Sequence, residues 1–279
     1  MSRFADAFMN HRGYFVDKWE QYLGIYDFEL APFISAGEPV ALLEIGIQNG
    51  GSLQLWREVL PKGSKIVGFD IDPACANLQF DERTRVHIVD GTDRAQIDAV
   101  LQDDMFDIII DDGSHRSEDI IETYRALFRR VRGGGKFFIE DLHASYWSGF
   151  GGGFRHPASA MEFLKGLVDG LNCDHFLETG DTPRAELDHL RDFGQAVAAM
   201  TFYDSMCVIA FMGAPRSTPY RRVHGGGETP VVPMSAFASR DKLASLSTVL
   251  ASRTAARHLD KVLLGQIEEL LAAQRPEPD

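Results

Sequence analysis

The sequence predicts an α/β protein with a Rossmann-like, doubly wound and mostly parallel sheet, and two observations point to it. Five short apolar runs between residues 40 and 141 each end on an acidic residue or a glycine. Continuous apolar runs are typical of parallel strands, because helices bury such strands on both faces. Helix-compatible segments separate the runs, which gives the alternation of strand and helix found in doubly wound sheets.

The elements can be placed along the chain. The expected strands are VALLEIG (40–46), KIVGFDID (65–72), RVHIVDG (85–91), MFDIIIDD (105–112) and GKFFIED (135–141). The segments compatible with helices between them are 52–60, 94–102 and 118–131. Residues 196–212 predict two strands about a turn at 203–205, a terminal antiparallel pair that closes the sheet. Mixed helical spacings over residues 14–35 predict one or two N-terminal helices.

These elements divide the chain into three parts. Residues 1–39 form an N-terminal helical segment, residues 40–213 form the central domain, and residues 214–279 form a linker and a helical tail. Leucine and valine recur at helical spacing between 243 and 271, which gives the tail an apolar stripe. The stripe packs either on its own domain or on a second subunit of a homo-oligomer, and the sequence leaves both readings open.

The composition limits the classes of partner. Lys and Arg total 28 against 41 Asp and Glu, so the net charge of −13 argues against nucleic acid or an anionic membrane as the main partner. The three cysteines have no paired spacing that would indicate disulfides or zinc. No run approaches the roughly 20 apolar residues that a membrane span needs. We expect a cytoplasmic protein that acts on a small molecule.

A glycine-rich loop follows the first expected strand and predicts a nucleotide-like cofactor site. Glu44 lies at the end of that strand, and Gly46 and Gly50 follow before a helix. Glycines let a backbone turn sharply and approach a ligand closely. Asp70 ends the second strand, where it can accept hydrogen bonds from ribose hydroxyls, and Asp90 ends the third, near the expected adenine. This layout is that of S-adenosylmethionine-dependent methyltransferases, although a dehydrogenase-like site or plain turn glycines would also explain the glycines.

Acidic residues also end the fourth and fifth strands. Asp112 closes FDIIIDD, and Glu140 and Asp141 close GKFFIED; neighbouring strands lie about 4.8 Å apart. Converging carboxylates without thiolates suit a hard ion, Mg²⁺ first. His115, three residues past Asp112, is the candidate general base. Asp111 or Asp112 could instead cap the next helix; we expect Asp111 to be the more structural of the two, and we also place it at the cofactor.

The glycine- and aromatic-rich segment at 145–159 lacks a regular period and predicts an ordered binding loop. His143 lies just before it and is a candidate substrate contact. Tyr146 and Trp147 offer flat apolar faces to a sugar ring, although they could equally pack the loop down.

Several blocks together resemble a known family. The blocks are LLEIGIQNGGSLQLW, VGFDIDP, FDIIIDDGSH, GGGKFFIEDLHASYW and FYDSMCVI. From about residue 14 to 211 the chain resembles bacterial class I methyltransferases related to macrocin and mycinamicin sugar O-methyltransferases. The resemblance implies that residues 40–213 bind S-adenosylmethionine and carry out Mg²⁺-dependent O-methylation of a sugar hydroxyl, on a natural product or a polysaccharide.

The resemblance also assigns residues. It places metal ligands on Asp112 and Asp141 and the base on His115, with Glu29 or Glu140 as a further acidic ligand. Two positions depart from the family pattern: Thr92 stands where glutamine is common, and Gln21 stands where many relatives have histidine. A methyltransferase of phenols or catechols and a non-catalytic S-adenosylmethionine-binding module remain alternatives.

Overall fold

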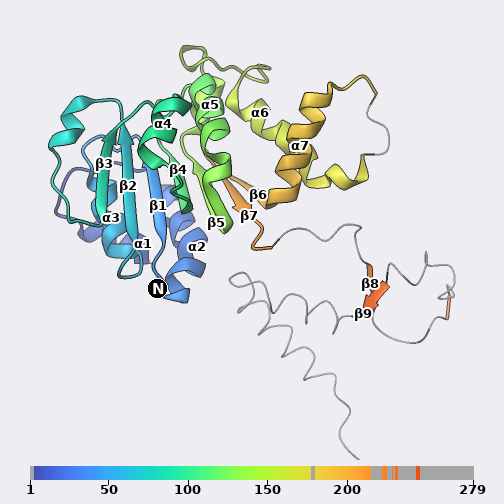
Figure 1. Cartoon of the computed structure of the whole chain (residues 1–279), viewed down its shortest axis with the longest axis horizontal. Helices are drawn as coiled ribbons and strands as arrows, with labels where there is room; N and C mark the ends of the chain where they lie inside the picture. The colour runs from blue at the N-terminus through green and yellow to red at the C-terminus, as the bar shows by residue number, and fades with distance from the viewer. Residues whose placement is uncertain are drawn as a thin grey trace, which may run out of the picture.

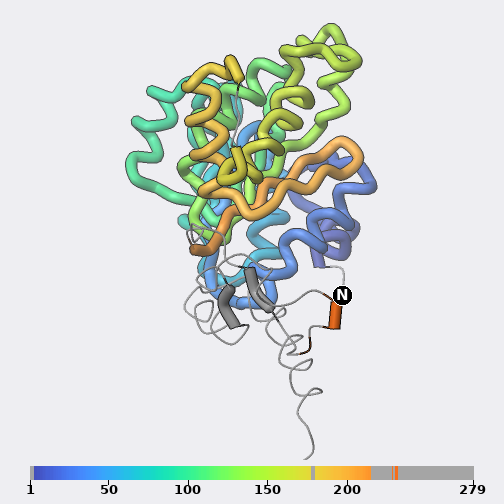
Figure 2. Tube along the Cα trace, turned by 90° about the vertical axis from the view of Figure 1, so that its right-hand side faces the viewer, coloured from blue at the N-terminus to red at the C-terminus, as the bar shows by residue number. Residues whose placement is uncertain are grey.

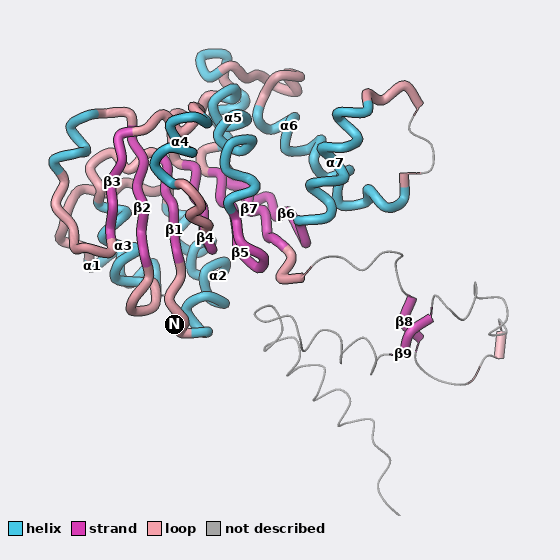
Figure 3. The backbone as a smooth tube through the Cα atoms, viewed as in Figure 1, coloured by secondary structure: helices cyan, strands magenta, loops and turns pink. Residues whose placement is uncertain are grey.

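A seven-stranded sheet in the order β3-β2-β1-β4-β5-β7-β6 forms the centre of the protein. The computed structural model describes residues 3–176, 180–214, 222–224, 228, 230–231 and 243–245. The strands are β1 (Ala41–Ile45), β2 (Lys65–Asp70), β3 (Thr84–Ile88), β4 (Phe106–Asp111), β5 (Val131–Ile139), β6 (Val197–Tyr203) and β7 (Met206–Phe211). They lie side by side in Figure 3, where they are magenta.

The sheet topology confirms the predicted fold class. β1 pairs in parallel with β2 and β4, β2 with β3, and β4 with β5. β7 runs antiparallel to both β5 and β6, which is the predicted terminal pair. The chain therefore reverses its winding direction between β1 and β4, and in doubly wound folds ligands bind at the carboxyl ends of the strands flanking that point.

Helices cover both faces of the sheet (Figure 1). They are α1 (Arg3–Asn10), α2 (Glu20–Ala36), α3 (Gly51–Val59), α4 (Arg94–Leu101), α5 (Ser117–Leu127), α6 (Ala160–Leu167) and α7 (Arg184–Ala196). The described residues also contain short 3₁₀ segments in the connections: η1 (Pro73–Asn77), η2 (Phe128–Arg130), η3 (Leu142–Tyr146), η4 (Ser148–Phe150) and η5 (Val168–His175). In Figure 2 the blue N-terminal helices and the yellow-green later helices lie on opposite sides of the orange β6–β7 hairpin.

Two apolar cores follow from the alternation of side chains along the strands. On one face α1, α2 and α3 pack through Phe4, Tyr26 and Trp56, whose rings meet at centroid distances of 4.9 to 5.0 Å. On the other face α4 to α7 pack on the same strands, with Tyr124 and Phe193 fully buried. Each such buried large apolar side chain contributes roughly 1.5–3 kcal/mol.

Residues 11–19, here called the N-terminal strap, differ from the sequence prediction. We expected helix from residue 14, but α2 begins only at Glu20 and the strap contains no helix. The Tyr14 amide donates to Gln54 Oε1 over 2.7 Å instead of to a helical carbonyl. A Cβ on Gly51 would lie 2.3 Å from Tyr14 O, so this glycine lets the strap pack against the start of α3. Tertiary contacts therefore override the local helical pattern.

The C-terminal part also departs from the prediction. The apolar stripe predicted a helix that includes Leu243, whereas Leu243–Ser245 forms strand β9, paired in parallel with β8 (Arg222–His224). Residues 246–279 lie outside the described residues, so the helical tail, its packing and the 214–279 boundary stay predictions. Within the part of the chain that the structure describes, no helix is long and apolar enough to span a membrane.

Candidate active site

A cavity of about 490 Å³ opens at the carboxyl ends of the central strands. The predicted strand-end carboxylates of Asp70, Asp90, Asp111, Asp112 and Asp141 all line it. The N-terminal strap lines it too, through residues 15–18, which were not among the predicted site residues. The cavity thus joins the switch point of the sheet to the N-terminal segment.

The strand ends on the predicted cofactor side are held by their own loops. Asp70 accepts the Gln48 amide over 2.8 Å, and Asp90 accepts the Thr92 amide over 2.9 Å. Thr92 itself lines the cavity, so this departure from the family pattern lies at the expected adenine side. A Cβ on Gly46 would lie only 2.1 Å from Asp112 O, so a glycine is required where the loop after β1 approaches the end of β4.

Two predicted cofactor residues do not line this cavity. Glu44 is fully buried, and its Oε2 accepts Ser52 Oγ over 2.7 Å and Trp56 Nε1 over 3.0 Å. Gly50 faces the loop around η1, where a Cβ would lie 2.9 Å from the Leu78 side chain. In this loop the cavity is lined by Gly46 and residues 47–48 instead. Glu44 and Gly50 therefore support the loop without lining the cavity.

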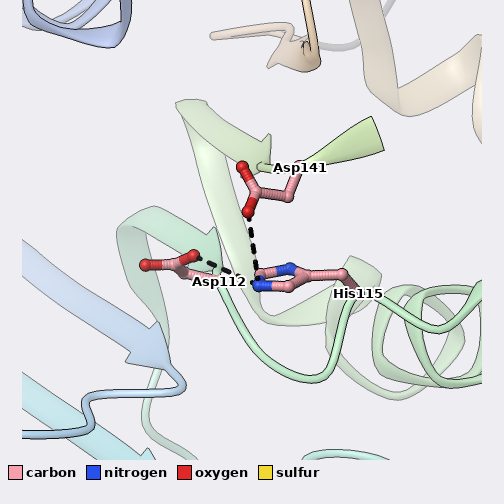
Figure 4. A group of neighbouring side chains, drawn as sticks. All are labelled: Asp112, His115 and Asp141. Carbon is pink, nitrogen blue, oxygen red and sulfur yellow. Dashed lines mark ion pairs between the residues drawn. The ribbon is translucent and has the colours of Figure 1, made fainter. Parts of the chain in front are cut away.

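Asp112, His115 and Asp141 lie together at the end of the cavity (Figure 4). His115 Nε2 is 3.5 Å from Asp141 Oδ2 and 3.9 Å from Asp112 Oδ1. One ligand atom from each residue fits within a mutual distance of 4.8 Å. His115 and Asp141 both have positive φ, 58° and 54°. Such backbone conformations are costly for residues other than glycine and cluster at functional sites.

Lys18, which the sequence analysis did not identify, lies directly beneath this group. Its buried ammonium donates to Asp112 Oδ2 and, over 2.8 Å, to Glu140 Oε1. Glu44 Oε1 is 4.0 Å away. Lys18 thus occupies one oxygen of Asp112 and leaves the other, Oδ1, facing His115.

Glu140 does not join the three clustered residues. Besides Lys18, its Oε1 accepts the Tyr26 hydroxyl, so the carboxylate faces the buried side of the sheet. Glu29, the other candidate for a further metal ligand, is engaged elsewhere: Lys136 Nζ lies 2.6 Å from its Oε2, and Tyr203 donates to its Oε1. Neither Glu140 nor Glu29 therefore lies with Asp112 and Asp141. The third residue of that group is His115.

Lys18 lies among three carboxyl groups, and burial and charge shift the pKa values of Lys18, Glu44 and Glu140. Burial alone would lower the pKa of Lys18, but the charges of Asp112, Glu140 and Glu44 outweigh it and raise the pKa above the usual lysine range. Burial raises the pKa of Glu44 to about 7, and burial together with the nearby Asp112 charge raises the pKa of Glu140. Both of these glutamate carboxyl groups therefore hold a proton more readily than usual, and a divalent cation bound at Asp112 would favour their ionised forms.

Asp111 binds its own loop through one oxygen and has a raised pKa. Its Oδ1 accepts the Gly113 amide over 3.3 Å, whereas its buried Oδ2 has no partner among the described residues. Burial raises its pKa to about 7. The predicted helix cap is not formed, because α5 begins after Arg116 without a side-chain cap. Asp111 still lines the cavity, as expected for a cofactor contact.

Tyr22 fixes Asp141 from the N-terminal side. Its hydroxyl lies 2.8 Å from Asp141 Oδ1 and 2.9 Å from the Asp141 amide, which donates to it. The neighbouring Gln21, which departs from the family pattern, is exposed. The N-terminal segment thus contributes to the site through Tyr22 and Lys18.

The predicted substrate residues follow Asp141 in the chain. His143 is half-buried, and Tyr146 and Trp147 are exposed. The imidazole contacts the Trp147 ring edge to face with centroids 4.8 Å apart. None of the three lines the 490 Å³ cavity itself, whereas Asp141 does.

The chain is similar in sequence to known methyltransferases. Residues 43–142 match the family model described as a methyltransferase domain. The chain is 29% identical over 204 residues to a rhamnosyl tetracenomycin-C 2'-O-methyltransferase of Streptomyces olivaceus, covering 69% of this chain and 51% of the relative. It is 36% identical over 160 residues to demethylmacrocin O-methyltransferase of Streptomyces fradiae, covering 52% of this chain and 39% of the relative.

Among solved structures, the chain is similar to the MycE methyltransferase of the mycinamycin biosynthetic pathway, in complex with Mg and SAH. The TM-score is 0.61 at 25% identity, over 76% of this chain and 53% of that chain. The chain therefore spans about half the length, or less, of the relatives named here.

The residues that match the methyltransferase domain model, 43–142, lie in the Rossmann-like sheet and its loops. The two curated relatives named above are both O-methyltransferases. The family resemblance seen in the sequence is confirmed.

Proposed function

We propose that the protein is a Mg²⁺-dependent S-adenosylmethionine O-methyltransferase that methylates a sugar hydroxyl of a glycosylated small molecule. The observation that carries this proposal is the convergence of Asp112, His115 and Asp141 at the end of a cavity lined by Asp70 and Asp90. Relatives named for sugar O-methylation support the choice of acceptor.

The two carboxylates and the surrounding charge suit a hard divalent ion. Asp112 Oδ1 and Asp141 Oδ2 are oxygen donors of the kind that Mg²⁺ prefers, and both lie near His115 Nε2. Lys18 binds Oδ2 of Asp112, so Oδ1 stays available to an ion. When bound, Mg²⁺ would lower the pKa of an acceptor hydroxyl and help to orient it.

In this proposal His115 takes the proton from the acceptor hydroxyl. Bound S-adenosylmethionine would supply the methyl group: its C–S bond would break as the hydroxyl oxygen forms the new C–O bond, leaving S-adenosylhomocysteine. Asp141 accepts from Tyr22, and Asp112 accepts from Lys18, so both carboxylates are fixed before an acceptor arrives. Such positioning accounts for much of the rate enhancement in enzymes.

Methyl transfer to a panel of acceptors tests the proposal. Purified protein is incubated with S-adenosylmethionine, MgCl₂ and either glycosides, such as methyl α-L-rhamnopyranoside and mycinamicin VI, or catechols. We expect a methylated glycoside by mass spectrometry, lost with EDTA and with Asp141→Asn but kept with Asp103→Asn at an exposed position. Methylation of catechols alone would contradict the acceptor class, and cofactor binding without transfer to any acceptor would indicate a binding module.

A further inference from the structure

Trp19 ends the N-terminal strap and lies on the imidazole of His143. The two rings meet edge to face, with centroids 5.4 Å apart and an interplanar angle of 84°. The indole remains 53% exposed. Its neighbour Lys18 is buried beneath the metal-site carboxylates, so the backbone that carries Trp19 is anchored. The indole is thus an exposed aromatic group at a fixed place beside His143.

A second exposed indole meets the same imidazole. Trp147, 51% exposed, contacts His143 at 4.8 Å and 69°, and also lies 5.8 Å from the Phe150 ring. Trp19 and Trp147 are 128 positions apart in the sequence, yet both contact His143. Each indole contacts the imidazole of His143, so the three rings form one exposed aromatic group.

His143 is oriented by Ser205. The Ser205 hydroxyl binds His143 Nδ1 and also accepts the His143 amide over 3.3 Å. Among the described residues, Nε2 of His143 has no hydrogen-bond partner, and the ring is half-buried at the rim. Nε2 can therefore bind a ligand hydroxyl.

The same turn connects this surface to the candidate metal site. Ser205 O accepts the Leu142 amide over 2.9 Å and lies 3.0 Å from the Tyr22 hydroxyl, which fixes Asp141. His143 is only two positions beyond Asp141. A ligand on His143 and the tryptophans would thus lie beside the carboxylates that hold the reacting hydroxyl.

We propose that Trp19, His143 and Trp147 form the acceptor subsite, which holds a pyranose ring by its apolar C–H face and one of its hydroxyls. This proposal rests on the proposed function and adds Trp19 as a residue that determines specificity. A pyranose matches this surface in two ways: its apolar C–H face can pack on an indole, and its hydroxyls can bind His143 Nε2.

Steady-state kinetics of Trp19→Leu tests the subsite, with the glycoside that the wild-type protein methylates best. Phe28→Leu is the matched control, since Phe28 is another exposed aromatic residue, 71% exposed, on the adjacent helix α2. We expect Trp19→Leu to raise KM for the glycoside by ~10-fold, as for loss of a well-placed aromatic contact, with kcat changed by less than about 2-fold. The Kd for S-adenosylhomocysteine should match that of the control.

A second measurement follows binding without turnover. Of the three tryptophans, Trp56 is fully buried, so Trp19 and Trp147 should account for any quenching by the glycoside in the presence of S-adenosylhomocysteine. Trp19→Phe should restore part of the affinity lost in Trp19→Leu, and Trp147→Leu should raise KM independently if Trp19→Leu fails to fold.

The outcomes separate the two proposals. If the wild-type protein methylates no glycoside, the proposed function is wrong and the subsite is wrong with it. If glycosides are methylated but Trp19→Leu, or Trp147→Leu in its place, keeps the KM of Phe28→Leu, the subsite is wrong and the proposed function stands. A lowered kcat with unchanged KM would also overturn the subsite.

Discussion

Lys18 Nζ lies 2.8 Å from Glu140 Oε1, and both side chains are buried under the cleft. This pair joins the N-terminal strap directly to the end of β5, and the second bond of Lys18, to Asp112, joins the strap to the end of β4. The strap is therefore part of the cavity wall, and the Lys18 charge belongs to the same cluster as the candidate metal ligand Asp112.

Lys18→Met should destabilise the fold by about 3–5 kcal/mol, because it leaves carboxylates buried without their cation. The matched control is Lys136→Met, which breaks a less deeply buried pair with Glu29 on the same face of the sheet, where neither partner lines the cavity. Both variants should unfold at lower denaturant concentration. Only Lys18→Met should also weaken S-adenosylhomocysteine binding, by about tenfold or roughly 1.4 kcal/mol, since residues 15–18 line the cavity. Equal cofactor affinity in the two variants would show that the strap does not support the pocket.

Asp141→Asn should abolish most Mg²⁺-dependent transfer while cofactor binding stays nearly intact. The substitution removes a charged oxygen from the three-residue group but keeps an acceptor for the Tyr22 hydroxyl. Titration with Mn²⁺ followed by electron paramagnetic resonance measures ion binding directly, and calorimetry measures S-adenosylhomocysteine binding. Wild-type ion affinity in this variant would remove Asp141 from the ligand set.

His115→Ala should lower turnover by ~10²-fold or more, the usual scale for loss of a general base. Its Nε2 lies between Asp112 and Asp141, so the same variant reports whether the imidazole binds the ion instead. Lost turnover with intact Mn²⁺ affinity would indicate the base, and lost turnover with lost affinity would indicate a ligand. Unchanged turnover would contradict both roles.

Glu44 should make the fold less stable as the pH rises. Burial raises its pKa in the folded protein to about 7 from the ordinary 4.5. A raised carboxyl pKa favours folding while the group is protonated, so this contribution is full below about pH 4.5 and is lost as the pH rises through about 7. The loss amounts to up to about 3 kcal/mol.

Unfolding of the wild-type protein and of Glu44→Gln between about pH 5 and about pH 8 tests this sign. Glutamine keeps an acceptor for Ser52 and Trp56 but does not titrate. The free energy of unfolding of the wild type should fall relative to the variant as the pH increases. Parallel curves would mean that Glu44 does not titrate in this range.

Much of the fold could be predicted because each central strand carries its own signal. The runs ending at Asp70 and Asp112 are continuous and apolar, and their periodicity needs no knowledge of tertiary contacts. The strap could not be predicted in the same way. Its aromatic residues resemble a helix locally, but Tyr14 bonds to Gln54, forty positions away.

The candidate site was predictable where it follows strand ends and not where it depends on long-range pairing. Asp112, His115 and Asp141 come together because β4 and β5 are neighbours in parallel register. Lys18 lies 94 positions before Asp112, and a lone lysine ahead of a helix gives no signal of such a partner. Likewise Glu44 ends β1 as expected, but its side chain faces Ser52 and Trp56 instead of the cavity.

The most direct measurement is anomalous scattering from a crystal of the protein grown with S-adenosylhomocysteine and MnCl₂. We expect a manganese peak at Asp112 and Asp141, about 2.0–2.6 Å from their oxygens, the range for hard divalent ions, with the nucleoside beside Asp70 and Asp90. A crystal with the nucleoside in that cavity, no manganese peak, and Lys18 as the sole cation on Asp112 would contradict it.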